Sequence, residues 1–158
     1  MRRLDLGQTI NSIANVGVIV GIVFLVVEIN QSNRISSYSA EHSRRNQFIE
    51  INSNRIENAD VYSKLQSNDV ELTPPERAQA LMMSRQLLNT WQDAESAYSY
   101  GLLSDRTFAV TLLDIEVSVE EAPGLLPFMA YLVEVYDFES NSSQVADRVI
   151  EIVRENGY

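Results

Sequence analysis

The feature that most constrains this chain is an uncharged, strongly apolar run close to its N-terminus. From Leu6 to Val27 there are 22 consecutive residues without a charge, and from Val16 onward they are only Val, Ile, Leu, Phe and Gly. A helix rises about 1.5 Å per residue, so about 20 of these residues reach about 30 Å, the thickness of a bilayer's hydrocarbon core. The run therefore predicts a transmembrane helix.

Two other structures are compatible with such a run. One is a buried core helix, because the wholly apolar part is only 12 residues long. The other is a cleaved signal peptide, since Met1-Arg2-Arg3 resembles the basic start of one. The residues that follow the run, Glu28-Ile29-Asn30-Gln31, offer no small-x-small cleavage site. We therefore expect the segment to be retained as a span.

Two unusual faces lie on the predicted span, roughly 140° apart on a helical wheel. One is a polar stripe made of Gln8, Asn11, Ser12 and Asn15. The other is a small-residue stripe made of Ala14, Gly17 and Gly21, which Glu28 extends one heptad further. Small residues let a second helix approach closely, and polar side chains in lipid form interhelical hydrogen bonds. We predict helix–helix contacts on both faces, although the polar stripe equally fits a position among lipid headgroups.

Charge is distributed unevenly along the chain. There are 12 Lys and Arg against 22 Asp and Glu, and residues 46–158 hold seven of the bases and nineteen of the acids, a net charge of −12. This acidity argues against nucleic acid as a partner and against contact of the acidic part with anionic lipid. The positive-inside rule leaves the orientation open, because basic residues flank both ends of the run: Arg2 and Arg3 before it, and Arg34, Arg44 and Arg45 after it.

Residues 30–58 contain neither Pro nor Gly, so the membrane helix can continue through them as a stem. A heptad-like seam follows this stem and consists of Ile35, Tyr38, His42, Arg45, Ile49, Asn52 and Ile56. Three of these seven positions are polar, which makes a poor coiled coil in isolation. We predict that the seam packs against the head or against a neighbouring subunit.

Residues 59–158 read as an acidic, wholly helical head. Thr73-Pro74-Pro75-Glu76 has the form of a capping box with proline at the first helical position, and Gly101 is a suitable stop. Further helices are predicted over 61–67, from Ser104 to about residue 122, over 125–138, and from Ser142 or Ser143 to Gly157. The predicted fold class is all-α, with residues 1–29 as tail and transmembrane helix, residues 30–58 as stem, and residues 59–158 as a small helical-hairpin bundle.

The layout resembles a bacterial family of small single-pass membrane proteins of uncharacterised function. The resemblance rests on the segment that follows the span, residues 28–34, on a helix containing Trp91, and on Gly101-Leu102-Leu103. The family typically has a Gln-Asn-Thr-Arg type sequence after the span; Gln31 and Arg34 match it here, whereas Ser32-Asn33 depart from it. The resemblance implies an anchor in the bacterial inner (cytoplasmic) membrane with a cytoplasmic helical head, and it supplies no catalytic residues.

The residues offer little for catalysis. The chain has no Cys, which excludes disulfides and thiolate chemistry, and His42 is its one imidazole. No nucleotide-binding or zinc-hydrolase motif occurs. Asp114 with Glu116, or Glu120 with Glu121, could bind a divalent cation, but carboxylates in such places usually face water. We therefore expect a noncatalytic protein without cofactor or metal.

Two further features fit either a purely structural role or a functional one. Trp91, Tyr98 and Tyr100 form an aromatic group, which in a helical head favours core or interface packing over a ligand cage. Glu28 is the charged residue at the predicted membrane border. Three roles fit this position: a place at the lipid–water interface, a place in the lining of a pore, and a contact with the helix of a neighbouring subunit.

Three functions remain open from the sequence. The first is a scaffold or structural assembly, in which span and stem associate with copies of the same chain in the lipid bilayer. The second is an accessory subunit of a larger transporter or respiratory complex, with the polar and glycine faces on different partners. The third is a homomeric pore lined by Gln8, Asn11 and Asn15.

Overall fold

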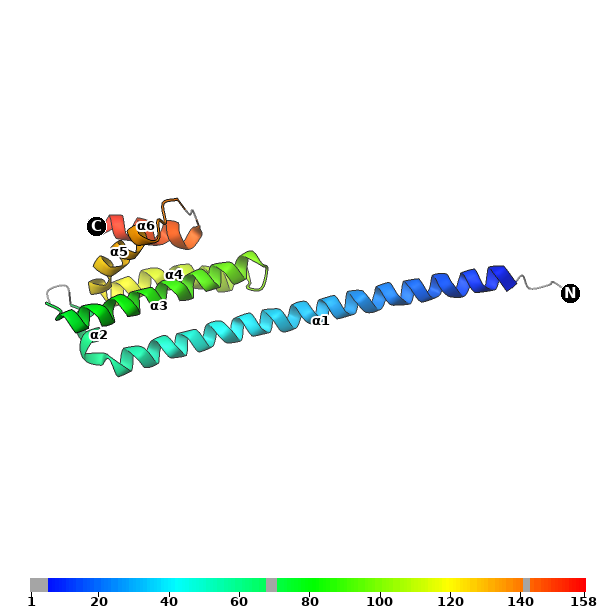
Figure 1. Cartoon of the computed structure of the whole chain (residues 1–158), viewed down its shortest axis with the longest axis horizontal. Coiled ribbons are helices and arrows are strands. Elements are labelled where there is room, and N and C mark those ends of the chain that lie inside the picture. Colours follow the sequence, from blue (N-terminus) through cyan, green and yellow to red (C-terminus); the bar gives the residue numbers. More distant parts are fainter. Residues whose placement is uncertain (1–5, 68–70, 141–142) are drawn as a thin grey trace. The chain divides into compact units, whose positions relative to one another are not determined.

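The computed structural model describes residues 6–67, 71–140 and 143–158, without the side chains of residues 6–9 and 12 (Figure 1). Within these ranges all regular structure is helical. The α-helices are α1 (Leu6–Glu57), α2 (Ala59–Leu65), α3 (Pro74–Ser99), α4 (Asp105–Glu121), α5 (Leu126–Val135) and α6 (Gln144–Glu155), and a 3₁₀ helix, η1 (Pro123–Leu125), precedes α5. The predicted all-α class, with a long N-terminal helix followed by a helical bundle, is confirmed.

The chain divides into two compact units, the first ending at Ser39 and the second running from Ala40 to Tyr158. The second unit contains the last part of α1 together with the helices that follow it. The stem expected over residues 30–58 is therefore shared between the units, because residues 40–58 group with the head.

Helix α1 is continuous because nothing in it interrupts the backbone ladder: it contains no proline, and Gly17 and Gly21 cost only about 1 kcal/mol each. Among the described residues, α1 is the helix that is long and apolar enough to cross a membrane. None of the residues in its most apolar 18-residue window is buried. A core helix of a soluble protein would be largely buried. The exposure of α1 therefore differs from what the buried-core-helix alternative predicts.

The head is built around α3, which contacts α2, α4, α5 and α6. Local chemistry sets its ends as predicted: the Thr73 amide donates to Glu76 Oε2 at 2.8 Å, and Gly101 follows the helix with φ +70°. Ser104 and Ser143 cap α4 and α6 by accepting from the amides three residues on. Ser142, the other candidate cap, lies outside the described residues.

The core of the head is apolar and closely packed. Trp91, Leu88 and Ile115 are fully buried together with side chains from each of the other head helices. Gly124 marks the tightest backbone contact, because a Cβ there would lie 2.8 Å from the Leu65 carbonyl oxygen. This glycine allows η1 to lie directly against the end of α2.

One predicted helix is shorter than expected. The apolar segment predicted as a helix over 125–138 begins as η1 and ends as α5 at Val135. Asp137 has φ +49°, which a continuing α-helix does not allow, and Phe138 is buried beyond it. Phe138, the apolar residue that extended the predicted helix, instead packs in the core from the turn that follows α5.

Candidate functional site

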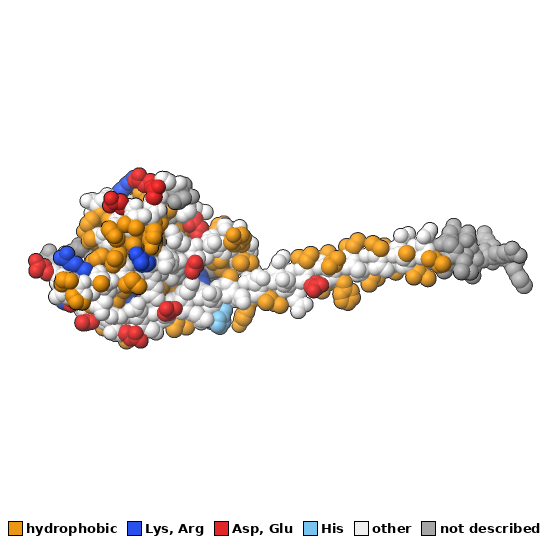
Figure 2. Space-filling model, viewed as in Figure 1, with side chains coloured by type: hydrophobic (Ala, Val, Ile, Leu, Met, Phe, Trp, Pro, Cys, Tyr) orange, Lys and Arg blue, Asp and Glu red, His pale blue; other side chains and the backbone are white. Residues whose placement is uncertain are grey.

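The first candidate site is the exposed apolar surface of α1. From Ile10 to Ile29 the large apolar side chains are each more than half exposed, and Phe24 is 73% exposed. Figure 2 shows these hydrophobic side chains along the helix. A contiguous surface of this kind is far larger than soluble monomers leave in water, so it requires lipid or protein around it.

The residues of the two predicted stripes are on this helix. Asn11, Asn15, Ala14, Gly17, Gly21 and Glu28 are all exposed, whereas the side chains of Gln8 and Ser12 lie outside the described residues. A Cβ placed on Gly17 or Gly21 would meet nothing within 4 Å. Contacts within the described chain therefore give no reason for glycine at either position, and the space beside them is open to a neighbouring helix.

The stem seam is exposed as well. The exposed fraction is 60% for Ile35, 71% for Tyr38, 57% for Ile49 and 77% for Ile56. His42 is exposed too, and its Nδ1 lies 3.1 Å from the side-chain amide nitrogen of Asn46. Within the head unit, the head therefore leaves Ile49 and Ile56 more than half exposed. Packing of the seam against a neighbouring subunit stays a prediction.

A different face of the stem contacts the head, and it does so mainly through polar side chains. Gln47 donates to Asp93 at 2.8 Å, Asn54 donates to Gln86 at 2.8 Å, and Asn58 accepts from Gln79 at 3.2 Å. Stem numbers rise as α3 numbers fall, so the two helices are antiparallel. Ile51, at 4% exposed, is the buried apolar residue of this face.

The aromatic and acidic residues singled out in the sequence separate in the fold. Trp91 is in the core and its Nε1 donates to Asp114 at 2.8 Å, Tyr98 stacks on Phe108, and Tyr100 is exposed. Burial raises the pKa of Asp114, against the opposing effects of the Trp91 hydrogen bond and of Arg55. Trp91 and Tyr98 therefore serve packing, and the three aromatic residues do not form one cage.

The acidic pairs do not converge on a common point. Asp114 bonds Trp91, whereas Glu116 is ion-paired with Arg148, and Glu121 lies 3.7 Å from Arg55. The described part of the chain holds no group of three or more His, Cys, Asp or Glu side chains placed to bind a metal ion.

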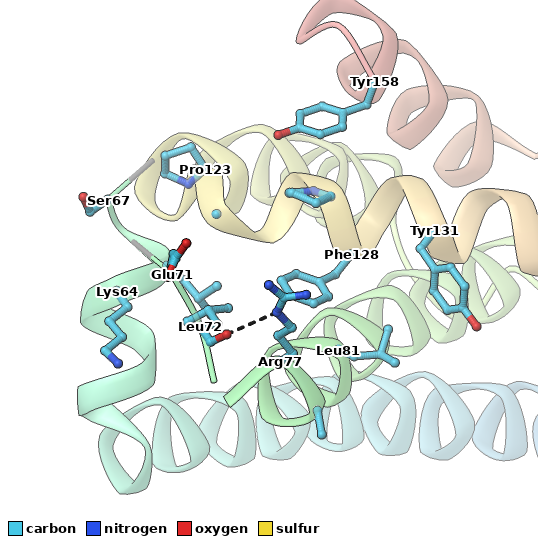
Figure 3. Close-up of a pocket in the computed structure, with 14 residues that line it drawn as sticks. Lys64, Ser67, Glu71, Leu72, Arg77, Leu81, Pro123, Phe128, Tyr131 and Tyr158 are labelled. Atoms are coloured by element: carbon cyan, nitrogen blue, oxygen red, sulfur yellow. Dashed lines mark hydrogen bonds between the residues drawn. The ribbon is translucent and has the colours of Figure 1, made fainter. Parts of the chain in front are cut away.

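The second candidate site is a pocket of about 780 Å³ in the head (Figure 3). Its apolar surface comes from Leu65, Leu81 and Phe128, and Lys64 and Arg77 lie among the lining residues. The Arg77 Nε donates to the Leu72 carbonyl at 3.2 Å, and Tyr131 and Tyr158 contribute rings and hydroxyls. Among the residues that the structure describes, this lining holds neither His nor Cys. Sequence reasoning missed this pocket because its walls come from segments far apart in the chain.

Beside this pocket, the Lys64 ammonium lies 2.5 Å from Glu76 Oε1. This hydrogen bond, with those from Thr73, lowers the pKa of Glu76 from 4.5 to about 2. The folded head therefore favours the charged carboxylate form of Glu76. The stability that this carboxylate contributes is present above pH 4.5 and is lost as the pH falls towards 2.

We expect Glu76→Gln to lower the Tm of the head at pH 7 and to reduce the further fall in Tm between pH 4.5 and pH 2. The Tm is measured by circular dichroism of the whole protein in mild detergent, with the exposed Glu120→Gln as the control. Equal acid dependence of Glu76→Gln and the unmodified protein would contradict this role for Glu76.

No protein-family model, curated protein or solved structure matches the chain.

Proposed function

We propose that this protein is a noncatalytic, single-pass membrane protein that self-assembles through its transmembrane and stem helices and displays acidic helical heads on one side of a bilayer. Its role is that of a scaffold or structural assembly. The location proposed is the inner membrane of a bacterial cell, with the head in the cytoplasm. The observation that carries the proposal is the exposure of the described part of the apolar run in α1, where none of the residues in the most apolar 18-residue window is buried.

The energetics support a bilayer around this helix. Each large apolar side chain taken out of water contributes about 1.5–3 kcal/mol, and α1 exposes twelve such side chains between Ile10 and Val27. That total exceeds the stability of a typical domain, so the helix needs an apolar environment. The uncharged run from Leu6 to Val27 within α1 has a length that suits a bilayer's hydrocarbon core.

Self-assembly is supported by two exposed surfaces of α1. Gly17 and Gly21 have open space where a Cβ would be, and the stem seam is exposed. In lipid, close approach of helix backbones at small residues is a main source of association. A copy of the same chain supplies the matching surface, and closed symmetric homo-oligomers are the commonest assemblies.

Replacing Gly17 and Gly21 together by Leu is expected to weaken the assembly, because the added side chains keep the helices apart. The measurement is native mass in mild detergent, and we expect a fall from a several-fold mass towards the monomer. Ile19→Leu with Val23→Leu is the matched control, with the same spacing on the opposite face of the helix. An unchanged native mass for the glycine variant would contradict the proposal.

The same preparation tests the accessory-subunit alternative, which the two separated faces of α1 favour. Self-assembly predicts a particle that contains this chain alone. Foreign chains present in fixed stoichiometry would support the accessory role instead.

A further inference from the structure

The pocket in the head has a floor that the fold holds in place. Leu65 is fully buried at the end of α2, and its backbone lies directly against Gly124, where a Cβ would come within 2.8 Å of the Leu65 carbonyl oxygen. Leu72 and Phe128 are partly buried and pack against the core of the head. With a volume of about 780 Å³, the pocket has the size and the preformed apolar surface of a small-molecule site.

This pocket also gathers positive charge in an acidic part of the chain. Residues 46–158 hold seven basic residues against nineteen acidic ones, and two of the seven, Lys64 and Arg77, lie in the lining. Lys64 is ion-paired with Glu76 at 2.5 Å. For Arg77, by contrast, no carboxylate of the described residues lies within ion-pair distance. Arg77 is therefore the cation of this lining whose charge is available to a ligand.

The guanidinium of Arg77 is held by one nitrogen and leaves two others for a ligand. Its Nε donates to the Leu72 carbonyl oxygen at 3.2 Å, which restricts the rotation of the group. Figure 3 shows the side chain pointing from α3 towards Phe128 of α5. No hydrogen bond to another described residue uses its two Nη atoms. The parallel N–H donors of a guanidinium match the two oxygens of a carboxylate.

The rest of the lining decides which anion fits. Glu71 belongs to the same lining, and its carboxylate disfavours a doubly charged group such as a phosphate monoester, because like charges repel. Leu65, Leu81 and Phe128 supply apolar surface, which favours a ligand that brings hydrocarbon out of water. A singly charged anion with an apolar body meets both conditions.

We propose that this pocket binds a small amphipathic carboxylate. Arg77 holds the carboxylate group, and the apolar body lies against Leu65, Leu81 and Phe128. The lining belongs entirely to the second compact unit, residues 40–158. The inference therefore goes beyond the proposed assembly and does not depend on it.

The test is isothermal titration calorimetry of the full-length protein in mild detergent, with a titration into detergent alone subtracted. The probes are 2-naphthoate and octanoate, which carry the carboxylate on a ring and on a chain, and each is compared with its neutral amide. Arg77→Gln removes the guanidinium, and Arg106→Gln, at an exposed arginine outside the lining, is the matched control. Ala78→Phe fills part of the pocket from an exposed position of α3.

We expect one or both acids to bind, and the matching amide to bind about tenfold more weakly, because it lacks the charge-assisted hydrogen bonds. Arg77→Gln should weaken binding of the acid by about tenfold and leave binding of the amide unchanged. Arg106→Gln should bind the acid as the unmodified protein does. Ala78→Phe should weaken acid and amide alike, because it reduces the space that both occupy.

Failure of both acids to bind would overturn the proposal, as would equal affinity for an acid and its amide. Equal weakening of acid and amide by Arg77→Gln would show that Arg77 shapes the pocket without holding the carboxylate, and would overturn it too. These outcomes are dissociation constants, whereas the proposed assembly is judged by native mass. Failure of the site and failure of the assembly are therefore distinguishable.

Discussion

Arginine at both Val18 and Ile22 is expected to stop the protein from entering the membrane. Each arginine near the centre of a membrane helix opposes insertion by about 2.5–3.5 kcal/mol, and each replaced residue gives up a further 0.3–0.6 kcal/mol or so. The pair therefore costs about 6–8 kcal/mol, which exceeds the summed preference of about 2–5 kcal/mol of the large apolar residues that remain between Val16 and Val27. We expect the variant to be lost from membranes that float in a density gradient, which also separates it from aggregates.

Leucine at the same two positions is the control, because it keeps the run apolar. The Leu variant should float with the membranes as the unmodified protein does. If the arginine variant floats equally well, the run does not sit in the hydrocarbon core.

Trp91→Ala is expected to unfold the head or bring it close to unfolding. The Trp91 side chain is fully buried, and removal of a buried tryptophan costs about 3–5 kcal/mol. Asp114 also loses the donor that it bonds at 2.8 Å. Domains of this size have a free energy of unfolding of about 5–15 kcal/mol, so the variant loses a large share of it.

The measurement is thermal unfolding in mild detergent, followed by circular dichroism. Trp91→Phe is the partner variant: it keeps most of the buried ring but removes the N–H, so it should cost only about 1–3 kcal/mol. A Tm for Trp91→Ala equal to that of the unmodified protein would show that the core is not organised around this side chain.

Local chemistry made the helix ends predictable. The capping box at Thr73, the stop at Gly101 and the cap at Ser104 each depend on residues within one helical turn. Such signals need no tertiary information, so they could be interpreted from the sequence alone. A helix long and apolar enough to span a bilayer can be recognised from the sequence in the same way, because length and composition decide this property.

The contact face of the stem was not predictable from apolar spacing. The pattern selects Ile49 and Ile56 as the face to bury, yet the head contacts Gln47, Asn54 and Asn58 through side-chain amides. Their partners lie on α3, far away in sequence, and hydrophobic periodicity carries no information about such pairs. The apolar spacing instead marks a face that the chain leaves uncovered.

The pocket was missed for a similar reason. Lys64, Arg77 and Phe128 come from three separate helices, and no spacing in the sequence connects them. Gly124 gave a partial signal, because a Pro-Gly pair indicates a turn. Its function of admitting the Leu65 backbone emerges only once α2 and η1 are packed together.

The most direct test of the account is the location of the unmodified full-length protein after lysis without detergent. The account predicts that it stays with the lipid through an alkaline carbonate wash, floats with the membranes, and enters solution only when detergent is added. A protein recovered entirely in the soluble fraction as a lone monomer would contradict it.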